Sequence, residues 1–420
     1  MKKKYVRWTL WTIASPFILF IILCILIYLP PIQNFLVDKA AVYASEATGM
    51  NISVGRISLS FPLNLVVTNV DAASPHNDTL LSVRRLQVNV QLLPLLKKQV
   101  EVDGISLQGA TVNSNDLIHG MKLNGTLGEL FISSHGVALD PETAIVNKVL
   151  LKDTDLSLCL NDTAAADTAA SDTTYWKIIL QDIDLQNVSF ALDMPLDSLS
   201  LAASLDNAIL RDGLIDLHKS AYSLQTFRIK NGRVRYDSGK PLAADSLPSG
   251  LDPSHIALTD IGVKLDSLYY GGRNMKAIIS QFVLKERSGV EIVSATGRMV
   301  SNDKVLRVPS LKLETRDSYL ELNAAMDWNA LDFKDEGLVS ARLMADIGKP
   351  DVVRFMGSMD EKFIRQYPSE PLRIRTGIDG DLNKLKLTTL TAELPGALGL
   401  FARGELTLSL IHISEPTRRV

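Results

Sequence analysis

Two pairs of aspartates come closest, by residue type and spacing, to a chemical site in this 420-residue chain. Asp153 and Asp155 are separated by one residue, as are Asp182 and Asp184. In a β-strand this spacing places both carboxylates of a pair on one face. Such a pair could hold a cation or serve glycosidic chemistry. Apolar residues alternate with each pair, so we favour the interpretation that the aspartates form the solvated faces of amphipathic strands.

The other residue types that carry chemistry are scattered. The six histidines include no pair at the three- or four-residue spacing that places two imidazoles on one helical face. The two cysteines, Cys24 and Cys159, provide neither a disulfide framework nor a thiolate metal site. The sequence contains no G-x-S-x-G, phosphate-binding loop or dinucleotide fingerprint. We therefore expect a protein that is not an enzyme, with no catalytic residue, no cofactor and no metal.

The charge balance argues against nucleic acid as a partner. The formal net charge is -3, and acidic and basic residues are interspersed along the chain. A nucleic-acid-binding surface requires clustered basic residues, which this pattern does not supply.

The N-terminus predicts a membrane anchor. An uncharged apolar run from Trp8 to Leu29 follows a basic segment and precedes two prolines. At about 1.5 Å per helical residue it is long enough to cross a hydrocarbon core of about 30 Å. The alternative is a cleaved signal peptide, but those have shorter apolar cores and a small-residue cleavage site. The basic flank places the N-terminus in the cytoplasm and the rest of the chain across the membrane. The anchor residues singled out are Trp8, Trp11, Phe17, Phe20 and Leu29.

Beyond the prolines the hydrophobic period changes twice. Apolar residues at three- and four-residue steps from Ile32 to Ala47 predict an amphipathic helix that ends at Gly49. Alternation with period two follows, from Ile57 to Val67 and again from Leu86 to Leu92, which predicts strands with one apolar face. Turn signals separate such runs, and the chain is predicted to be mostly β and antiparallel. These signals are Ser74 to Asp78, Asn124-Gly125, Asn231-Gly232, Gly271-Gly272 and Asp379-Gly380.

One degenerate phrase recurs in the β region. It consists of an apolar residue, an apolar pair spaced by one, then Gly, Asn or a substitute, then another apolar residue. The copies run from Val102 to Val112, Leu180 to Phe190 and Leu224 to Val234, with a weaker one from Leu258 to Leu268. Their irregular spacing argues against a propeller or tight solenoid and favours paired strands with variable loops in an extended sheet.

Two further segments stand apart from the strands. Residues 161–174 are low in complexity and lack large apolar side chains, which predicts a flexible loop. Apolar residues between Val352 and Ile364 predict a short amphipathic helix before Pro368. Capping of the sheet is favoured for this helix over contact with a membrane.

We interpret the last residues of the chain as non-native. Residues 408–420 look like the translation of a sequencing-library adapter, so we expect the native sequence to be truncated near Thr407. His412 is accordingly not considered as a ligand.

The stretch from Lys2 to Asn113 resembles the N-terminus of the AsmA-like superfamily of envelope proteins, and within it the TamB family. The matching elements are the anchor, the helix that ends at Gly49, and the segments Ile52 to Phe61, Leu80 to Val83 and Val100 to Val112. Two later passages, Phe227 to Tyr236 and Gly380 to Leu387, resemble the same family more diffusely. The loop at 161–174 departs from the family pattern. The C-terminal domain that characterises the TamB family is missing from this sequence.

This resemblance implies a long antiparallel sheet curled into a β-taco-like groove, anchored in the inner membrane of a Gram-negative cell and extending through the periplasm. It implies phospholipid as the ligand and a role in envelope biogenesis. A trough can cover its apolar floor with acyl chains, each CH₂ contributing about 0.8 kcal/mol. Packing of the same residues against the helix at 32–48 is the alternative. The expected floor residues are Ile57, Leu59, Phe61, Leu63, Leu86, Val88 and Val90.

Three functions remain open at this stage. The first is a lipid conduit toward the outer membrane. The second is a TamB-like assembly factor that docks an outer-membrane barrel of the TamA or BamA kind, and the third is an anchored enzyme or glycan-binding module. The predicted divisions are the anchor at 1–31, the helix and first sheet at 32–160, the loop at 161–174, the continuing groove at 175–407 and the non-native tail at 408–420.

Overall fold

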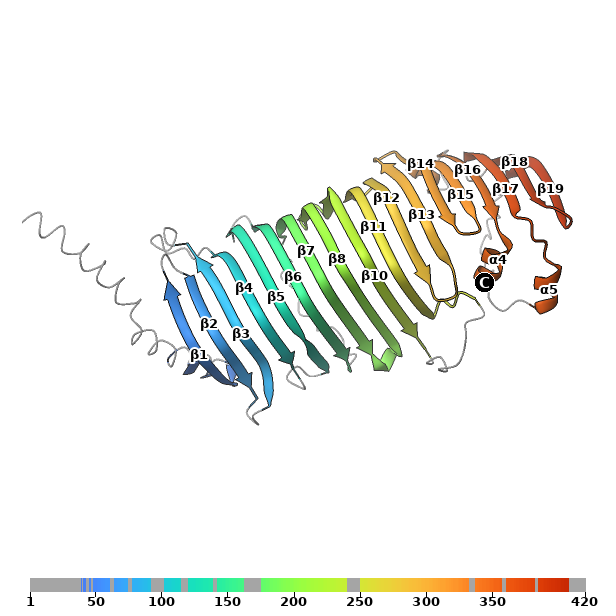
Figure 1. The fold of residues 1–420 in the computed structure, drawn as a ribbon. Helices are drawn as coiled ribbons and strands as arrows, with labels where there is room; N and C mark the ends of the chain where they lie inside the picture. The colour runs from blue at the N-terminus through green and yellow to red at the C-terminus, as the bar shows by residue number, and fades with distance from the viewer. Residues whose placement is uncertain are drawn as a thin grey trace, which may run out of the picture. The chain divides into compact units, whose positions relative to one another are not determined.

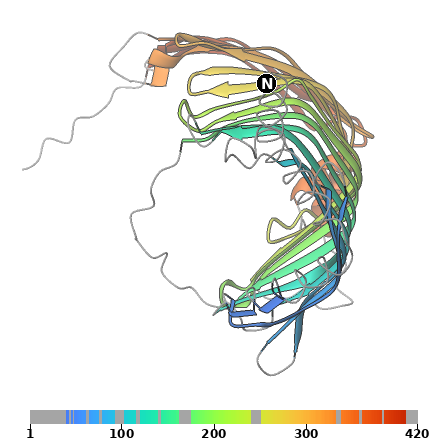
Figure 2. The same cartoon turned by 90° about the vertical axis from the view of Figure 1, so that its left-hand side faces the viewer.

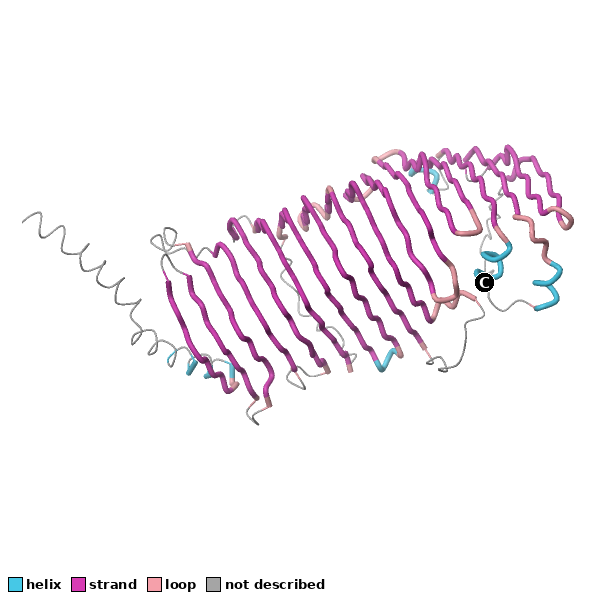
Figure 3. The backbone as a smooth tube through the Cα atoms, in the orientation of Figure 1, coloured by secondary structure: helices cyan, strands magenta, loops and turns pink. Residues whose placement is uncertain are grey.

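The structure is a computed structural model, and β-strands make up most of it (Figures 1 and 3). It describes residues 39, 41–42, 45–46, 48–60, 64–74, 78–91, 102–114, 120–138, 142–161, 175–239, 250–331, 337–356, 360–381 and 384–407. The prediction of a mostly β, antiparallel chain is confirmed.

The described residues form 19 strands, two complete α-helices, part of a further helix before β1 and two short 3₁₀ turns. The strands of the first part are β1 (Asn51–Ser60), β2 (Asn64–Ala73), β3 (Thr79–Val90), β4 (Val102–Asn113), β5 (Met121–Ala138), β6 (Thr143–Leu160) and β7 (Lys177–Met194). Those of the second part are β8 (Leu199–Asp216), β9 (Ala221–Leu224), β10 (Thr226–Ser238), β11 (His255–Gly271), β12 (Asn274–Glu286), β13 (Glu291–Ser301), β14 (Val305–Thr315), β15 (Tyr319–Asp327), β16 (Leu338–Ile347), β17 (Leu372–Asp381), β18 (Lys384–Leu394) and β19 (Leu398–Thr407). The 3₁₀ turns are η1 (Pro195–Asp197) and η2 (Trp328–Leu331), and the helices are α4 (Lys349–Met356) and α5 (Glu361–Gln366).

The chain divides into two compact units. Unit 1 comprises residues 1–173 and 178–202, and unit 2 comprises residues 174–177 and 203–420. The division falls within β8. Of the flexible loop predicted at 161–174, only Asn161 is among the described residues.

In unit 1, each strand from β1 to β6 pairs antiparallel with the next. Side chains join β6 to β7, since Asn147 donates to Gln181 over 2.9 Å. The longer strands of this unit, cyan to green in Figure 2, curve along their own length.

In unit 2, each strand from β11 to β18 pairs antiparallel with the next. β9 and β10 together act as one interrupted strand. β10 pairs with β8 and with the first part of β11, and β9 pairs with the ends of the same two strands. The interruption is Gln225, whose backbone N–H donates to the carbonyl oxygen of Arg211 over 3.2 Å.

Three of the predicted turns lie inside strands instead. Asn124-Gly125 lies within β5, Asn231-Gly232 within β10 and Asp379-Gly380 within β17. In each dipeptide one residue has positive φ: Gly125 (+155°), Asn231 (+55°) and Gly380 (+140°). A local backbone distortion inside a strand therefore favours the same residue types as a hairpin turn. The Gly271-Gly272 prediction holds, because β11 and β12 form a hairpin there.

The alternating run from Ile57 to Val67 spans two strands. Leu59 of β1 lies opposite Leu65 of β2, so this run belongs to a hairpin. Phe61 and Leu63 lie outside the described residues.

The predicted N-terminal helix is described only in part. Residues 39, 41, 42, 45, 46 and 48 are helical. Gly49 has φ +69°, and its N–H donates to the carbonyl oxygen of Ser45 over 2.9 Å, a C-terminal helix geometry. No helix within the described ranges has the length and apolarity to cross a membrane. The predicted anchor, with Trp8, Trp11, Phe17, Phe20 and Leu29, lies outside these ranges.

A line of distorted positions crosses the strands of unit 1. We define the left-handed line as the positions that face each other in register from β1 to β6: Gly55, Asn69, Arg84, Gly109, Gly128 and Asp153. Three of them, on alternate strands, have left-handed φ: Asn69 (+52°), Gly109 (+62°) and Asp153 (+49°). Asparagine, aspartate and glycine tolerate this conformation better than other residues.

The left-handed line changes the phase of each strand. On β4 the apolar residues Ile105 and Leu107 are followed by Ala110 and Val112, a step of three in place of two. A regular strand would place Leu107 and Ala110 on opposite faces. A left-handed residue between them interrupts the alternation and keeps the apolar residues on one face. The recurring phrase read from the sequence therefore has a structural cause, and Asn187 and Asn231 of the other copies also have positive φ, at +52° and +55°.

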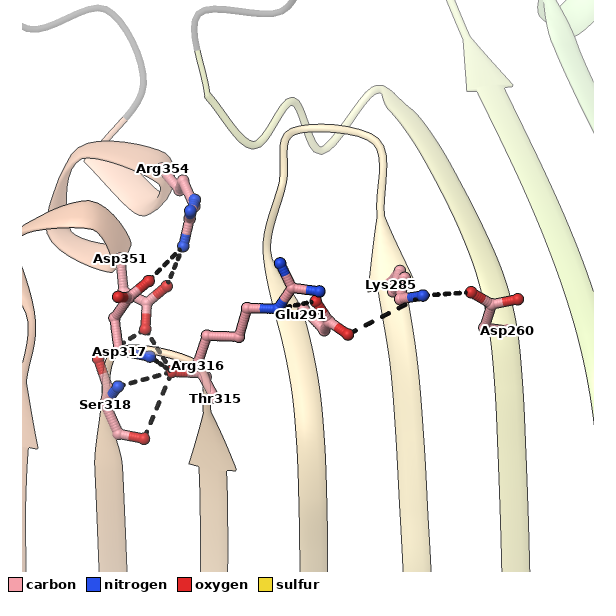
Figure 4. Close-up of polar contacts among 9 residues, drawn as sticks. All are labelled: Asp260, Lys285, Glu291, Thr315, Arg316, Asp317, Ser318, Asp351 and Arg354. Atoms are coloured by element: carbon pink, nitrogen blue, oxygen red, sulfur yellow. Dashed lines mark hydrogen bonds and ion pairs between the residues drawn. The ribbon is translucent and has the colours of Figure 1, made fainter.

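The segment predicted as one amphipathic helix forms two, α4 and α5. Asp360 caps α5, because its carboxylate accepts the N–H of Lys362 over 2.8 Å. Asp351 in the first turn of α4 is 1% exposed and accepts hydrogen bonds from the hydroxyl groups of Thr315 and Ser318 at the β14–β15 turn (Figure 4). Helix α4 is thus attached to the sheet.

Candidate functional site: apolar rows on the sheet

The register of unit 1 aligns apolar residues from every strand. We define row A as six residues that face each other in succession from β1 to β6. They are Ile57, Val67, Leu86, Leu107, Leu130 and Leu151. Directly facing residues in antiparallel strands share one face of the sheet. Row A is therefore a continuous apolar stripe that crosses six strands.

A second stripe lies two residues away on the same strands. Row B comprises Leu59, Leu65, Val88, Ile105, Ile132 and Val149. A polar row lies next to row A on the opposite face, formed by Arg56, Thr68, Arg85, Gln108, Glu129 and Lys152. The row between A and B on that opposite face is mixed, with Ser58, Val66, Gln87, Ser106, Phe131 and Leu150. The opposite face is therefore the more polar of the two.

The residues predicted as groove lining fall on these rows as far as they are described. Ile57 and Leu86 belong to row A, and Leu59 and Val88 to row B. Val90 follows Val88 by two residues, which gives it the same face of β3. The members on β2 and on β4 to β6 were not among the predicted lining residues. The recurring phrase could have found those on β4, because its apolar pair is Ile105 and Leu107.

The rows remain accessible. All of row A is half-buried, and so is row B apart from Ile105, which is 37% exposed. A side chain between two packed layers is usually buried, and full burial of a Leu or Ile contributes about 1.5–3 kcal/mol. These side chains gain only part of that free energy. The face can gain more if an apolar ligand covers it.

Unit 2 carries a longer stripe of the same kind. Row C comprises Ile229, Val263, Phe282, Ala295, Leu313, Leu320, Ala345, Ile374, Ala392 and Leu400, which face each other in succession from β10 to β19. Ala295 and Ala345 are buried, whereas Leu400 on the last strand is 46% exposed. Apolar rows are therefore a feature of both units.

The aspartate pairs are not assembled into a metal site. Asp153 lies on the left-handed line, and its carboxylate accepts a hydrogen bond of 2.9 Å from the amide of Asn187 on β7. Asp182 and Asp184 are half-buried on β7. Over the described part of the chain, no group of three or more His, Cys, Asp or Glu residues could hold a metal ion.

The most buried carboxylate has a structural role. Burial alone would raise the pKa of Asp351, but the hydrogen bonds from Ser318, Thr315 and Arg354 outweigh burial and hold this pKa below its ordinary value. Arg354 bonds Asp351 over 3.0 Å and Asp317 over 2.9 Å (Figure 4). The ionised carboxylate is thus fully occupied in holding α4 on the β14–β15 turn.

No protein-family model matches the chain, and no curated protein matches it significantly.

Proposed function

We propose that this protein is a membrane-anchored lipid conduit of envelope biogenesis, which carries phospholipid along the apolar rows of its sheet. The observation that carries the proposal is the continuity of rows A and B across six strands, with side chains that remain half-buried. The attraction is hydrophobic and needs no specific contact, since each CH₂ of an acyl chain removed from water contributes about 0.8 kcal/mol. No catalytic residue or cofactor is required.

The location in the cell forms part of the same proposal. The apolar run from Trp8 to Leu29 and the resemblance of Lys2 to Asn113 to AsmA-like proteins support a single-pass anchor in the inner membrane. The basic flank supports a cytoplasmic N-terminus, with the bulk of the chain in the periplasm. In this arrangement the sheet accepts phospholipid from the inner membrane and directs it toward the outer membrane.

Photo-cross-linking at neighbouring residues tests the conduit. A photoreactive amino acid is placed at Leu107 or Leu130 of row A, and at the matched controls Gln108 and Glu129, which lie one residue away on the polar row. The full-length protein is cross-linked in cells, purified and examined for lipid adducts by mass spectrometry. We expect phospholipid adducts at the two leucines and none at the controls. Equal labelling at all four positions, or none at any, contradicts the proposal.

A second candidate is assembly of outer-membrane proteins, and the exposed apolar strand β19 favours it. Leu398, Leu400 and Phe401 of β19 are 50%, 46% and 70% exposed, and Figure 1 shows β19 as the last strand of unit 2. Exposed apolar side chains that lie together mark a surface that can bind an apolar partner. An unfolded outer-membrane barrel is the proposed client.

The test of this second candidate uses β19 and its neighbour. A photoreactive residue replaces Phe401 or, as control, Thr391, which lies directly opposite it on β18. A purified, urea-unfolded outer-membrane barrel protein is diluted into the full-length protein before illumination. Adducts at Phe401 and not at Thr391 support binding of the client at β19, and equal yields at both positions argue against it.

A further inference from the structure

Two like charges face each other on the sheet of unit 2. Arg228 of β10 lies directly opposite Lys264 of β11. Directly opposed residues share a face and have Cβ atoms about 4.5–5.5 Å apart, so like charges there are destabilising. Lys230, two residues beyond Arg228, adds a third cation on the same face. An anion bound among the three cations would offset their repulsion.

These cations surround a hollow of about 580 Å³. Arg228, Lys230 and Lys264 line it together with the amide side chains of Asn207 on β8 and Gln281 on β12. The apolar residues Ile209, Ile229, Val263 and Val283 complete the lining. Gly262 adds no side chain at this point of β11. The hollow therefore combines cationic groups with amides that can donate hydrogen bonds.

The acidic residues nearby are already engaged. Asp260 also lines the hollow, but it accepts a bond of 2.7 Å from Lys285 (Figure 4), and this hydrogen bond raises the pKa of Lys285. Asp266 is 3.9 Å from Lys264 and accepts a hydrogen bond from the hydroxyl group of Ser280. Asp206 accepts a hydrogen bond from Asn231. Protein carboxylates therefore neutralise the three cations only in part.

We propose that the hollow lined by Arg228, Lys230 and Lys264 is a binding site for a phosphate group. A phosphate group presents several oxygens, which match the planar fork of an arginine and the point charges of two lysines. The alternating side chains of β10 place this site on the face opposite row C, since Ile229 of row C lies between Arg228 and Lys230. Ile229 and Val263 of row C also border the hollow. The proposal concerns the charged side chains, so soluble phosphate probes test it separately from the lipid conduit.

Calorimetric titration of the purified full-length protein in detergent micelles tests the site. The probes are inorganic pyrophosphate, which represents a soluble phosphate compound, and glycerophosphoglycerol, which represents a lipid headgroup. The variants are Arg228→Gln and Lys264→Gln. The matched control is Lys276→Gln, an exposed lysine on β12 that does not line the hollow. We expect each variant to weaken binding at least tenfold and the control to bind within twofold of the unchanged protein.

Melting temperatures separate a binding role from a structural one. Because the cations repel each other, we expect Arg228→Gln to melt no lower than the unchanged protein without phosphate, and pyrophosphate to raise the melting temperature of the unchanged protein alone. The charge-conserving Arg228→Lys should retain binding. Tighter binding of pyrophosphate identifies a soluble ligand, and tighter binding of the diester identifies a headgroup. Absence of binding by both probes, or equal binding by the glutamine variants, overturns the proposal.

Discussion

Gly128 on β5 lies directly opposite Asp153 on β6, at the point where Asp153 adopts a left-handed backbone. The pair is one step of the left-handed line that crosses unit 1. Both strands keep their pairing register on either side of it, since Leu127 faces Thr154 and Glu129 faces Lys152. The line therefore changes which face the side chains occupy without shifting one strand along the other.

A side chain at Gly128 should disrupt this step. A Cβ atom there would lie 2.8 Å from Cβ of Asp153 and 2.9 Å from the carbonyl oxygens of Asp153 and Lys152. We expect Gly128→Ala to lower the free energy of unfolding by about 1–3 kcal/mol, as overpacking does. Gly404→Ala is the control, because an added Cβ there meets no atom within 4 Å. Denaturation followed by circular dichroism measures both, and an equal midpoint shift for the two variants would contradict the argument.

At the left-handed position Asn69, a residue type that favours strands should destabilise the protein. Asn69 is exposed and has φ +52°. Asn69→Val is expected to destabilise by about 1–2 kcal/mol, because a β-branched side chain disfavours the left-handed region. Asn69→Gly should be close to neutral, because glycine adopts this region freely. If the valine variant melted higher than the glycine variant, as strand propensity alone suggests, a strained backbone at Asn69 would be ruled out.

Attachment of α4 should depend on pH. The pKa of Asp351 is lower in the folded protein than the ordinary value of about 3.9, so its contribution to stability is fully present above that value. The contribution is lost as the pH falls through the folded pKa, because the unfolded chain then binds the proton more readily. Melting temperatures of the unchanged protein should therefore fall between pH 5 and pH 2.

The variant Asp351→Asn isolates this effect. It removes the charge that Arg354 contacts while retaining an oxygen that can accept from Thr315 and Ser318. We expect it to be about 1–3 kcal/mol less stable at pH 7 and to lose less stability on acidification. Exposed Glu361, paired with Arg365 on α5, provides the control Glu361→Gln. A pH profile of Asp351→Asn that parallels the unchanged protein would show that other carboxylates dominate.

A polar substitution in row A should lower stability only slightly but should reduce the amount of bound phospholipid. Leu130 is half-buried, so Leu130→Gln should cost about 1 kcal/mol, well below the loss expected for a fully buried leucine. We expect it to reduce co-purified phospholipid severalfold. The control Glu129→Gln alters the polar row on the adjacent residue and should leave the lipid content unchanged. Lipid mass spectrometry with an internal standard measures all three proteins.

Local pattern was sufficient to predict a mostly β, antiparallel chain and the glycine or asparagine position of the recurring phrase. It was not sufficient to distinguish a turn from a distorted strand. Asn231-Gly232 suits a hairpin, yet both residues lie within β10, because a left-handed residue meets the same conformational demand in either setting. The neighbouring strand decides between them, and that neighbour is distant in sequence.

The rows could not be predicted from local sequence pattern, because they depend on the pairing register between strands. Ile57 and Leu86 were predicted as floor residues, but their alignment with Leu107, Leu130 and Leu151 depends on five successive strand pairings. The position of Arg228 directly opposite Lys264 likewise depends on the register between β10 and β11. Neither residue is unusual within its own strand.

The left-handed line gives unit 1 a modular construction. Each of the strand pairs β1–β2, β3–β4 and β5–β6 contributes one left-handed residue to the line, Asn69, Gly109 or Asp153, so the alternation is corrected within each pair. A hairpin could be duplicated or deleted during evolution and its neighbours would still present the same side chains to the same side. Each strand gained would lengthen the apolar stripes by about 4.8 Å, the spacing between paired strands. The reach of such a protein is thus adjusted by the number of hairpins, while the cross-section stays the same.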